Sequence, residues 1–242
     1  YDQLVIWKTK RHGKSAMMIE GARRVGKSYI VEEFAKNEYK SHIIIDFFKV
    51  GDDIKDLFKN YRDNLDMLFI YLSTFYSPKL YPRESIIVFD EIEFCPAARA
   101  AIKYLVEDGR YDYLEIGSLL GMQMSTRKKL KSDEKQEDYL VPSEEEKMVL
   151  QPMDFEEFLW ALGEENLMEF VRMKFEIKEP VGQSMHRKLM DYFRLYMIVG
   201  GMPQAVMEYL ETRSFEDVDR VKRQILNLYN NCIDQYAGIH TP

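Results

Sequence analysis

Cysteine is scarce in this sequence, and its scarcity argues against two classes of protein. The 242 residues contain two cysteines, Cys95 and Cys232, which lie far apart and in no metal-ligand spacing. Disulfide-stabilised secreted domains and zinc-binding modules both need more cysteines at closer intervals. We therefore interpret the two as reduced, mostly packed thiols of a cytoplasmic protein.

Long apolar runs, an excess of positive charge and a signal peptide are also absent. No uninterrupted apolar stretch approaches the roughly 20 residues that span a bilayer, so we expect no membrane partner. The 34 Lys and Arg against 41 Asp and Glu give a net charge of −7, which argues against a cationic coat for nucleic acid. A local basic groove is still compatible with this charge, so nucleic-acid contact stays open. Because the chain begins with Tyr1 rather than Met, the missing signal peptide is only a weak argument about localisation.

What the chain does contain is the composition of a folded protein, with strand and helix patterns in alternation. Hydrophobic residues make up 46% and charged residues 31%, and the length suits one large or two small domains. The alternation predicts an α/β fold with a parallel five-stranded sheet and right-handed crossovers. Short runs rich in β-forming residues predict the buried strands, and longer segments between them predict the helices. The strands are expected at 16–19, 42–45, 86–89, 113–116 and 147–150, and the helices at 28–38, 53–75 and 97–107.

Beyond the sheet the periodicity becomes helical. Asp154 and Glu157 have the spacing of a capping box, and apolar stripes continue from there to Cys232, broken at residues 200–203. We predict an α/β core over residues 1–152 and an all-helical lid over residues 153–242. Residues 127–147, whose many charges nearly cancel, are interpreted as an exposed, mobile insertion.

The most informative segment is residues 21–28, which match the pattern G-x-x-x-x-G-K-[ST] in full. Glycines let the backbone curl so that its N–H groups point at phosphate oxygens, and the following helix N-terminus adds partial positive charge. Lys27 supplies a full charge for the β- and γ-phosphates, and the Ser28 hydroxyl can ligate Mg²⁺. Arg23 and Arg24 can brace the loop, contact phosphate or face solvent. The predicted nucleotide-binding residues are Gly21, Ala22, Arg23, Arg24, Val25, Gly26, Lys27, Ser28 and Tyr29.

Two further strand ends carry groups that suit a triphosphate site. The predicted strand 86–89 is followed by Asp90, placed to hold Mg²⁺, and by Glu91, placed to orient an attacking water or accept its proton. The next strand ends in Ser118, whose hydroxyl can sense the γ-phosphate, hold the water, or merely belong to a turn. Because the carboxyl ends of parallel strands meet at one sheet edge, these groups are expected to lie together. The predicted catalytic residues are Lys27 and Glu91, and the predicted metal ligands are Ser28 and Asp90.

With these motifs the chain resembles the prokaryotic AAA-superfamily ATP-binding proteins that carry a C-terminal domain of unknown function. The resemblance covers nearly the whole chain and includes two more particular segments, Pro152 to Leu159 and Gly200 to Pro203. It implies ATP with Mg²⁺ as cofactors, a strand order of 5-1-4-3-2, and Ser118 as a sensor. It also implies a further C-terminal domain. Since the chain starts at Tyr1 and stops at Pro242, we expect a fragment of a larger protein.

The sequence departs from that family pattern in its arginines. Arg24 stands where Gln or Gly is common, and no arginine is clearly placed as a transition-state finger, although Arg99, Arg110 and Arg127 are candidates. One such arginine is worth about 10³–10⁵ in rate, so we expect slow intrinsic turnover.

We predict an Mg²⁺-dependent ATPase that uses its nucleotide state to drive conformational change. The alternative is a nucleotide-gated interaction module with negligible turnover; a small-molecule kinase is a weaker hypothesis, because residues 160–200 lack a clear arginine pattern. No guanine-specific Asn-Lys-x-Asp segment occurs, and the preference for ATP and ADP rests mostly on the resemblance. Self-association or a protein partner would involve the helical lid or the C-terminal domain.

Overall fold

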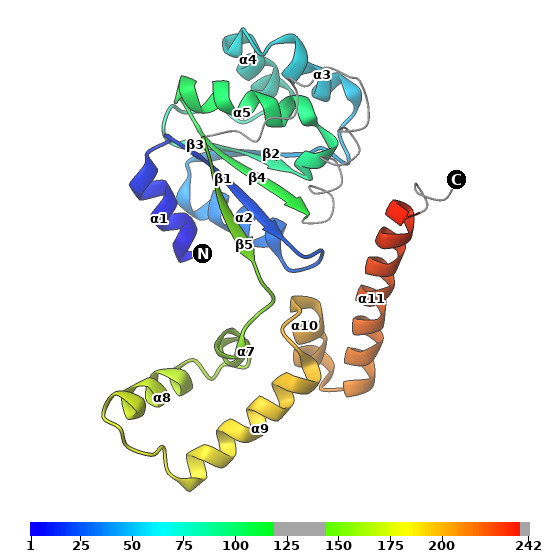
Figure 1. The fold of residues 1–242 in the computed structure, drawn as a ribbon. Helices are drawn as coiled ribbons and strands as arrows, with labels where there is room; N and C mark the ends of the chain where they lie inside the picture. The colour runs from blue at the N-terminus through cyan, green and yellow to red at the C-terminus, as the bar shows by residue number, and fades with distance from the viewer. Residues whose placement is uncertain (119–143, 238–242) are drawn as a thin grey trace. The chain divides into compact units, whose positions relative to one another are not determined.

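The computed structural model describes the backbone of residues 1–118 and 144–237, with side chains up to residue 231. The chain divides into two compact units (Figure 1). The first comprises residues 1–22 and 26–150, and the second comprises residues 23–25 and 151–242. In the described part of the chain, no helix is both long enough and apolar enough to cross a membrane.

The first unit is built on a parallel five-stranded sheet, as predicted. Its order is β2-β3-β4-β1-β5, and every neighbouring pair is parallel. This is the expected order read from the other edge, with β4 between β1 and β3. The strands are β1 (Ala16–Gly21), β2 (Ser41–Asp46), β3 (Ser85–Asp90), β4 (Asp112–Ser118) and β5 (Glu145–Leu150).

Strand β3 shows why the central strands read as continuous apolar runs. Its residues from Ile86 to Phe89 are all 0% exposed, because successive side chains enter cores on opposite faces of the sheet. Ile87 and Phe89 belong to one core, and Ile86 and Val88 belong to the other. A strand with one exposed face alternates apolar and polar residues; because both faces of β3 are covered, its sequence has no such alternation.

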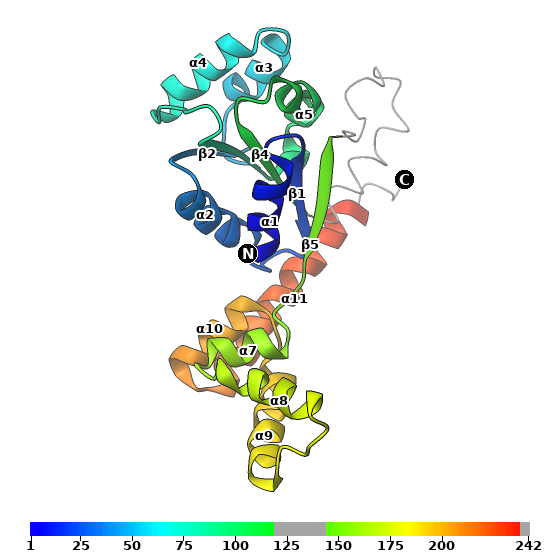
Figure 2. The same ribbon diagram turned by 90° about the vertical axis from the view of Figure 1, so that its left-hand side faces the viewer.

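Helices cover both faces of this sheet (Figures 1 and 2). On one face lie α3 (Asp52–Asn60), α4 (Leu65–Tyr76) and α5 (Pro96–Asp108), preceded by the short helix η1 (Ile92–Phe94). On the other face lie α1 (Asp2–Arg11) and α2 (Lys27–Glu38).

Two helices differ from the prediction. The single helix expected over 53–75 is two helices, because Asn64 caps α4 by accepting a hydrogen bond from the Met67 N–H at 3.2 Å. Helix α1 was not predicted; it buries Leu4 and Trp7, and the Trp7 indole donates to the Ser15 hydroxyl at 3.2 Å.

The predicted exposed insertion at 127–147 is wrong at its C-terminal end. Residues 127–143 lie outside the described part of the chain, but β5 begins at Glu145. The Glu145 side chain is fully buried at the start of this strand. Its burial is tolerated because it pairs with Arg99, the Nη2–Oε2 distance being 3.0 Å.

The second unit is helical, with α7 (Phe155–Ala161), α8 (Asn166–Glu176), α9 (Gln183–Val199), α10 (Pro203–Thr212) and α11 (Phe215–Ala237). The predicted capping box is present at the start of α7, where the side chains of Asp154 and Glu157 each accept the other residue's backbone N–H. The small core of this unit consists of Phe158, Val199, Ala205, Val206 and Val218.

The two particular segments of the helical unit contact each other. Met153 donates its N–H to the carbonyl of Gly201 at 2.8 Å, and its own carbonyl accepts from the Tyr196 hydroxyl at 2.8 Å. A Cβ atom on Gly201 would lie 2.0 Å from the Met153 oxygen. Only glycine therefore permits this close approach.

Candidate functional site

The site is assembled at the carboxyl edge of the sheet, where three strands end in the predicted residues. Gly21 at the end of β1 pairs in register with Ser118 at the end of β4. Asp90 ends β3, the next strand beyond β4, and pairs in register with Asp46 at the end of β2. The parallel register therefore brings the loop, the acidic pair and Ser118 to one edge, as the sequence predicted.

The loop after β1 turns sharply into α2. Gly26, the N-cap of α2, has a φ of 97°, and Arg24 has a φ of 67°. Left-handed backbone is unstrained for glycine but costs about 1 kcal/mol for a residue with a Cβ, so Arg24 is held there by the turn itself. Backbone of this kind forms the concave amide surfaces that bind anions.

Lys27 lies back along the loop that precedes it. Its ammonium group donates to the carbonyl of Gly21 at 3.0 Å and to that of Ala22 at 2.9 Å. The loop therefore has a full positive charge at the N-terminus of α2, where the partial charge of the helix has the same sign. This arrangement favours an anion with several oxygens.

Ser28 and Asp90 contact each other, although they are far apart in sequence. The Ser28 hydroxyl donates to Asp90 Oδ2 at 2.9 Å, and Asp90 Oδ1 accepts the N–H of Glu91 at 3.0 Å. Burial raises the pKa of Asp90, Asp46 also raises it, and the hydrogen bonds from Ser28 and Glu91 and the charge of Lys27 oppose this shift.

The Ser28–Asp90 contact fits Mg²⁺ as the implied metal. Both atoms are hard oxygen donors, and Mg²⁺ commonly takes one or two protein ligands and completes its octahedron with water and substrate phosphates. Among residues 1–118 and 144–231, no cluster of three or more His, Cys, Asp or Glu side chains is arranged as an all-protein metal cage.

Glu91 occupies a bend directly after the strand. Its φ of 52° lies in the left-handed region, and it forms the N-cap of η1. The backbone thus turns at the second member of the acidic pair, and the next residue, Ile92, is 0% exposed in the core. A strained backbone anchored by a buried neighbour is typical of a residue whose side chain must be held in place.

Two carboxylates at this edge were missed by the sequence reasoning. Glu93 Oε1 accepts the Ser118 hydroxyl at 2.8 Å and the Ser118 N–H at 3.3 Å. Asp46 accepts the Phe48 N–H at 3.0 Å and forms an ion pair with Lys49 at 2.6 Å. Each is an acidic residue at or just beyond the end of a predicted strand. The same pattern led us to predict Asp90 and Glu91, and it could also have indicated these two residues.

The candidate arginines that the structure describes are held elsewhere. Arg99 is 14% exposed and pairs with two buried carboxylates, Glu115 at 3.3 Å and Glu145 at 3.0 Å. Arg110 precedes β4 at the opposite, amino edge of the sheet and binds Asp108 and Asp66. The third candidate, Arg127, lies outside the described residues.

Tyr29 and the two cysteines complete the positions considered in the sequence. Tyr29, in the first turn of α2, is 73% exposed. Cys95 is free and buried, as expected for a packed thiol, and burial raises its pKa. The side chain of Cys232 lies outside the described residues.

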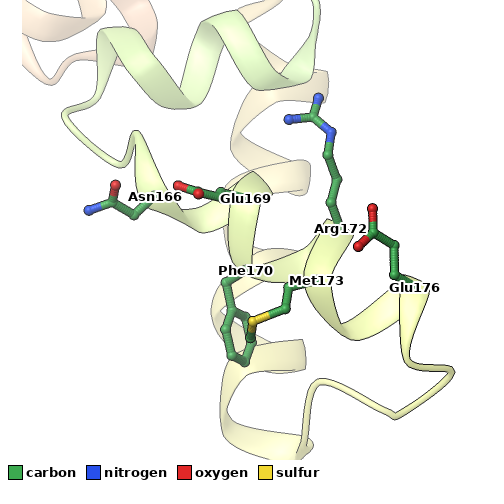
Figure 3. A pocket seen from close by; sticks show the side chains of 6 residues that line it. All are labelled: Asn166, Glu169, Phe170, Arg172, Met173 and Glu176. Atoms are coloured by element: carbon green, nitrogen blue, oxygen red, sulfur yellow. The ribbon is translucent and has the colours of Figure 1, made fainter.

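A hollow of about 530 Å³ in the helical unit is a separate feature (Figure 3). All its lining residues come from α8, and Arg172 among them is paired with Glu156. One helix cannot enclose a ligand, so we assign this hollow no function. Its lining consists of Asn166, Glu169, Phe170, Arg172, Met173 and Glu176.

The fold and this edge define a class of protein. A parallel sheet with a G-x-x-x-x-G-K-[ST] loop after its first strand, and with acidic residues ending a second strand beyond an inserted one, is a phosphate-loop nucleotide-binding domain. Residues 13–159 match the family described as AAA domain, and the chain belongs to that family. No curated protein matches the chain.

Proposed function

We propose that this protein is an Mg²⁺-dependent ATPase that uses its nucleotide state to move its helical unit. The observation that carries the proposal is the 2.9 Å contact between Ser28 and Asp90, because it joins the phosphate loop to the acidic strand end. A hydroxyl and a carboxylate held together in this way are suited to share one Mg²⁺ ion beside the bound triphosphate.

Lys27 would bind the β- and γ-phosphates. Its ammonium group is satisfied by two loop carbonyls at 3.0 and 2.9 Å, and phosphate oxygens are stronger, charged acceptors for the same protons. Bound Mg²⁺ would supply charge neutralisation of the phosphates and a fixed geometry for the leaving group. Ser28 and Asp90 would hold that ion.

Glu91 would orient the attacking water and accept its proton. It directly follows Asp90, at a bend that is anchored by buried Ile92. A carboxylate beside the metal-binding carboxylate favours hydrolysis over simple binding. We further propose that residues 1–152 form the ATPase core and that residues 153–242 act as its lid.

Turnover should be slow in the isolated chain. Arg99 and Arg110 are committed to carboxylates, so in the described part of the chain neither candidate is available as a transition-state finger. This observation also favours the alternative, a nucleotide-gated interaction module with negligible hydrolysis. The two functions differ in whether bound ATP is cleaved.

Two substitutions test the proposal. Lys27→Ala should weaken binding of a fluorescent ATP analogue by at least about 100-fold, because it removes the charge that meets the phosphates. Glu91→Gln should keep the affinity within about threefold and lower the single-turnover rate of hydrolysis about 100-fold or more. Glu107→Ala, an exposed acidic residue on α5, is the matched control and should change neither quantity.

The results separate the alternatives. Equal hydrolysis by the wild type and Glu91→Gln would remove Glu91 from the mechanism. ATP that stays bound and intact for hours on the wild-type protein would contradict the ATPase and support the interaction module. Failure of the wild type to bind nucleotide would exclude both.

A further inference from the structure

A third carboxylate at the sheet edge has a partner that suggests its role. We propose that Glu93 is a positioning residue that fixes the Ser118 hydroxyl so that its oxygen accepts a hydrogen bond from the attacking water. The inference rests on the proposed ATPase function and adds a residue that the sequence motifs do not include. It also decides between the two functional roles that the sequence left open for Ser118, sensing the γ-phosphate and holding the water.

The direction of the hydrogen bond carries the argument. Ser118 Oγ donates to Glu93 Oε1 at 2.8 Å, and a hydroxyl has one proton to give. While that proton is directed to Glu93, the Ser118 oxygen can only accept further hydrogen bonds. Phosphate oxygens are acceptors too and would repel it, whereas a water molecule can donate to it.

Backbone contacts hold Glu93 and Ser118 in position relative to each other. The same Glu93 oxygen accepts the Ser118 N–H at 3.3 Å, so the carboxylate accepts from both hydrogen-bond donors of the serine. Ser118 is 5% exposed and pairs in register with Gly21, the first residue of the loop. Glu93 lies on η1, two residues after Glu91, and η1 is anchored by fully buried Ile92.

The second carboxylate oxygen of Glu93, Oε2, also supports this role. Oε2 is inaccessible to solvent and has no hydrogen-bond partner among the residues that the structure describes. Within that part of the chain, both hydrogen bonds that the carboxylate accepts come from Ser118. Keeping a carboxylate oxygen out of contact with solvent costs free energy, and a function through Ser118 gives a reason to keep it.

A double-mutant cycle tests the proposal. Glu93→Ala and Ser118→Ala should each lower the single-turnover rate of ATP hydrolysis about 10- to 100-fold, the range expected when a reacting group is displaced by about 1 Å. The affinity for a non-hydrolysable ATP analogue should stay within about threefold in both variants, since neither side chain is assigned to the phosphates. The double variant should be no slower than the slower single variant, because Glu93 acts through Ser118.

A conservative variant and a control complete the design. Glu93→Gln keeps a carbonyl oxygen that can accept from Ser118, so its rate should return to within about threefold of the wild type. Glu107→Ala removes an acidic side chain from the exposed surface of α5 and should leave both the rate and the affinity unchanged.

Several outcomes would overturn the inference. Losses that multiply in the double variant would show that Glu93 acts independently of Ser118. A fall in analogue affinity as large as the fall in rate would assign Ser118 to the phosphate instead. A wild-type rate in Glu93→Ala, in a protein whose hydrolysis depends on Glu91, would reject the inference and leave the ATPase proposal standing. Absence of hydrolysis in the wild type would instead reject the ATPase proposal itself.

Discussion

Two glutamates lie in the core of the sheet and share one arginine. Glu115 on β4 and Glu145 on β5 flank strand β1 from its two sides, and both side chains are 0% exposed. Arg99 on α5 reaches both, and Lys147 lies 3.6 Å from Glu145. Two carboxylates and one buried guanidinium cannot all be ionised without a cost, so one carboxylate should keep its proton.

That carboxylate is Glu115. Burial raises its pKa to about 8, and the charge of Glu145 also raises it, while Arg99 opposes the shift. A carboxyl group whose pKa is raised on folding holds its proton in the folded state at a pH where the unfolded chain has released it. The free energy of unfolding should therefore fall as the pH rises from about 4.5 to about 8, and this contribution should level off above that range.

Glu115→Gln removes this titration and tests it. The variant mimics the protonated side chain, so its stability relative to the wild type should increase between pH 5 and pH 8, by up to a few kcal/mol. Urea unfolding at several pH values measures the difference. Glu107→Gln, which alters an exposed carboxylate on α5, should show no such trend. A stability difference that is constant with pH would contradict the raised pKa.

At the residue scale, the sequence predicted the groups whose roles follow from a motif. Lys27, Ser28, Asp90 and Glu91 all lie at the expected sheet edge. Their proximity followed from topology alone, because parallel strands end together. Glu93 was missed because its partner, Ser118, is 25 residues away, and a side-chain contact over that separation needs the fold. That Arg24 contributes to nucleotide binding stays a prediction.

At the scale of elements, the strands were predictable where burial is complete and were misread where charge is buried. β3 was found from its apolar run, whereas the start of β5 was taken for an exposed insertion because Glu145 and Lys147 are charged. Only the fold shows that Arg99 neutralises Glu145. The break between α3 and α4 was missed because Asn64, which caps α4, is one polar residue among several in that segment of the sequence.

The contact between Met153 and Gly201 gives a prediction for the helical unit. Gly201→Ala would place a Cβ atom 2.0 Å from the Met153 carbonyl oxygen, so the backbone must move and the hydrogen bond between these residues must lengthen. We expect a loss of about 2–4 kcal/mol in the stability of this unit, since overpacking and a broken hydrogen bond act together. Thermal unfolding followed by circular dichroism measures it.

Gly182, in the same unit, serves to distinguish the effect of a steric contact from the effect of backbone conformation. Gly182 has a φ of 83°, but a Cβ atom there would meet nothing within 4 Å. Its ψ of 153° places it in a region that is nearly restricted to glycine, so Gly182→Ala should cost only this backbone strain, about 1–3 kcal/mol. If both variants lose the same stability, the close approach to Met153 is not what requires Gly201.

At the scale of the whole molecule, the net charge of −7 matters because the proposed ligand is also an anion. Long-range electrostatics oppose the approach of a triphosphate to an acidic protein. Positive charge must therefore be concentrated where the phosphates bind. The structure provides it through Lys27 and the N-terminus of α2, while Asp46, Asp90, Glu91 and Glu93 surround the same edge with negative charge.

This balance predicts a strong dependence on Mg²⁺. A divalent cation held by Ser28 and Asp90 would neutralise charge that the protein itself does not, so it should be needed for tight binding. With Mg²⁺ and ATP at 100 times the dissociation constant, the protein should gain about 2.7 kcal/mol of stability. Chelation by EDTA at the same ATP concentration should remove most of this gain, as measured by the thermal unfolding midpoint.

Two variants assign that dependence to the site. Ser28→Ala removes one proposed ligand, so its stabilisation by ATP with Mg²⁺ should fall towards the value of the wild type in EDTA. Lys27→Ala should show no stabilisation by ATP in either condition, because the phosphates would lose the ammonium group that is proposed to bind them. If EDTA leaves the ATP-induced shift of the wild type unchanged, the protein binds free ATP. The contact between Ser28 and Asp90 would then be a structural hydrogen bond and not a metal site.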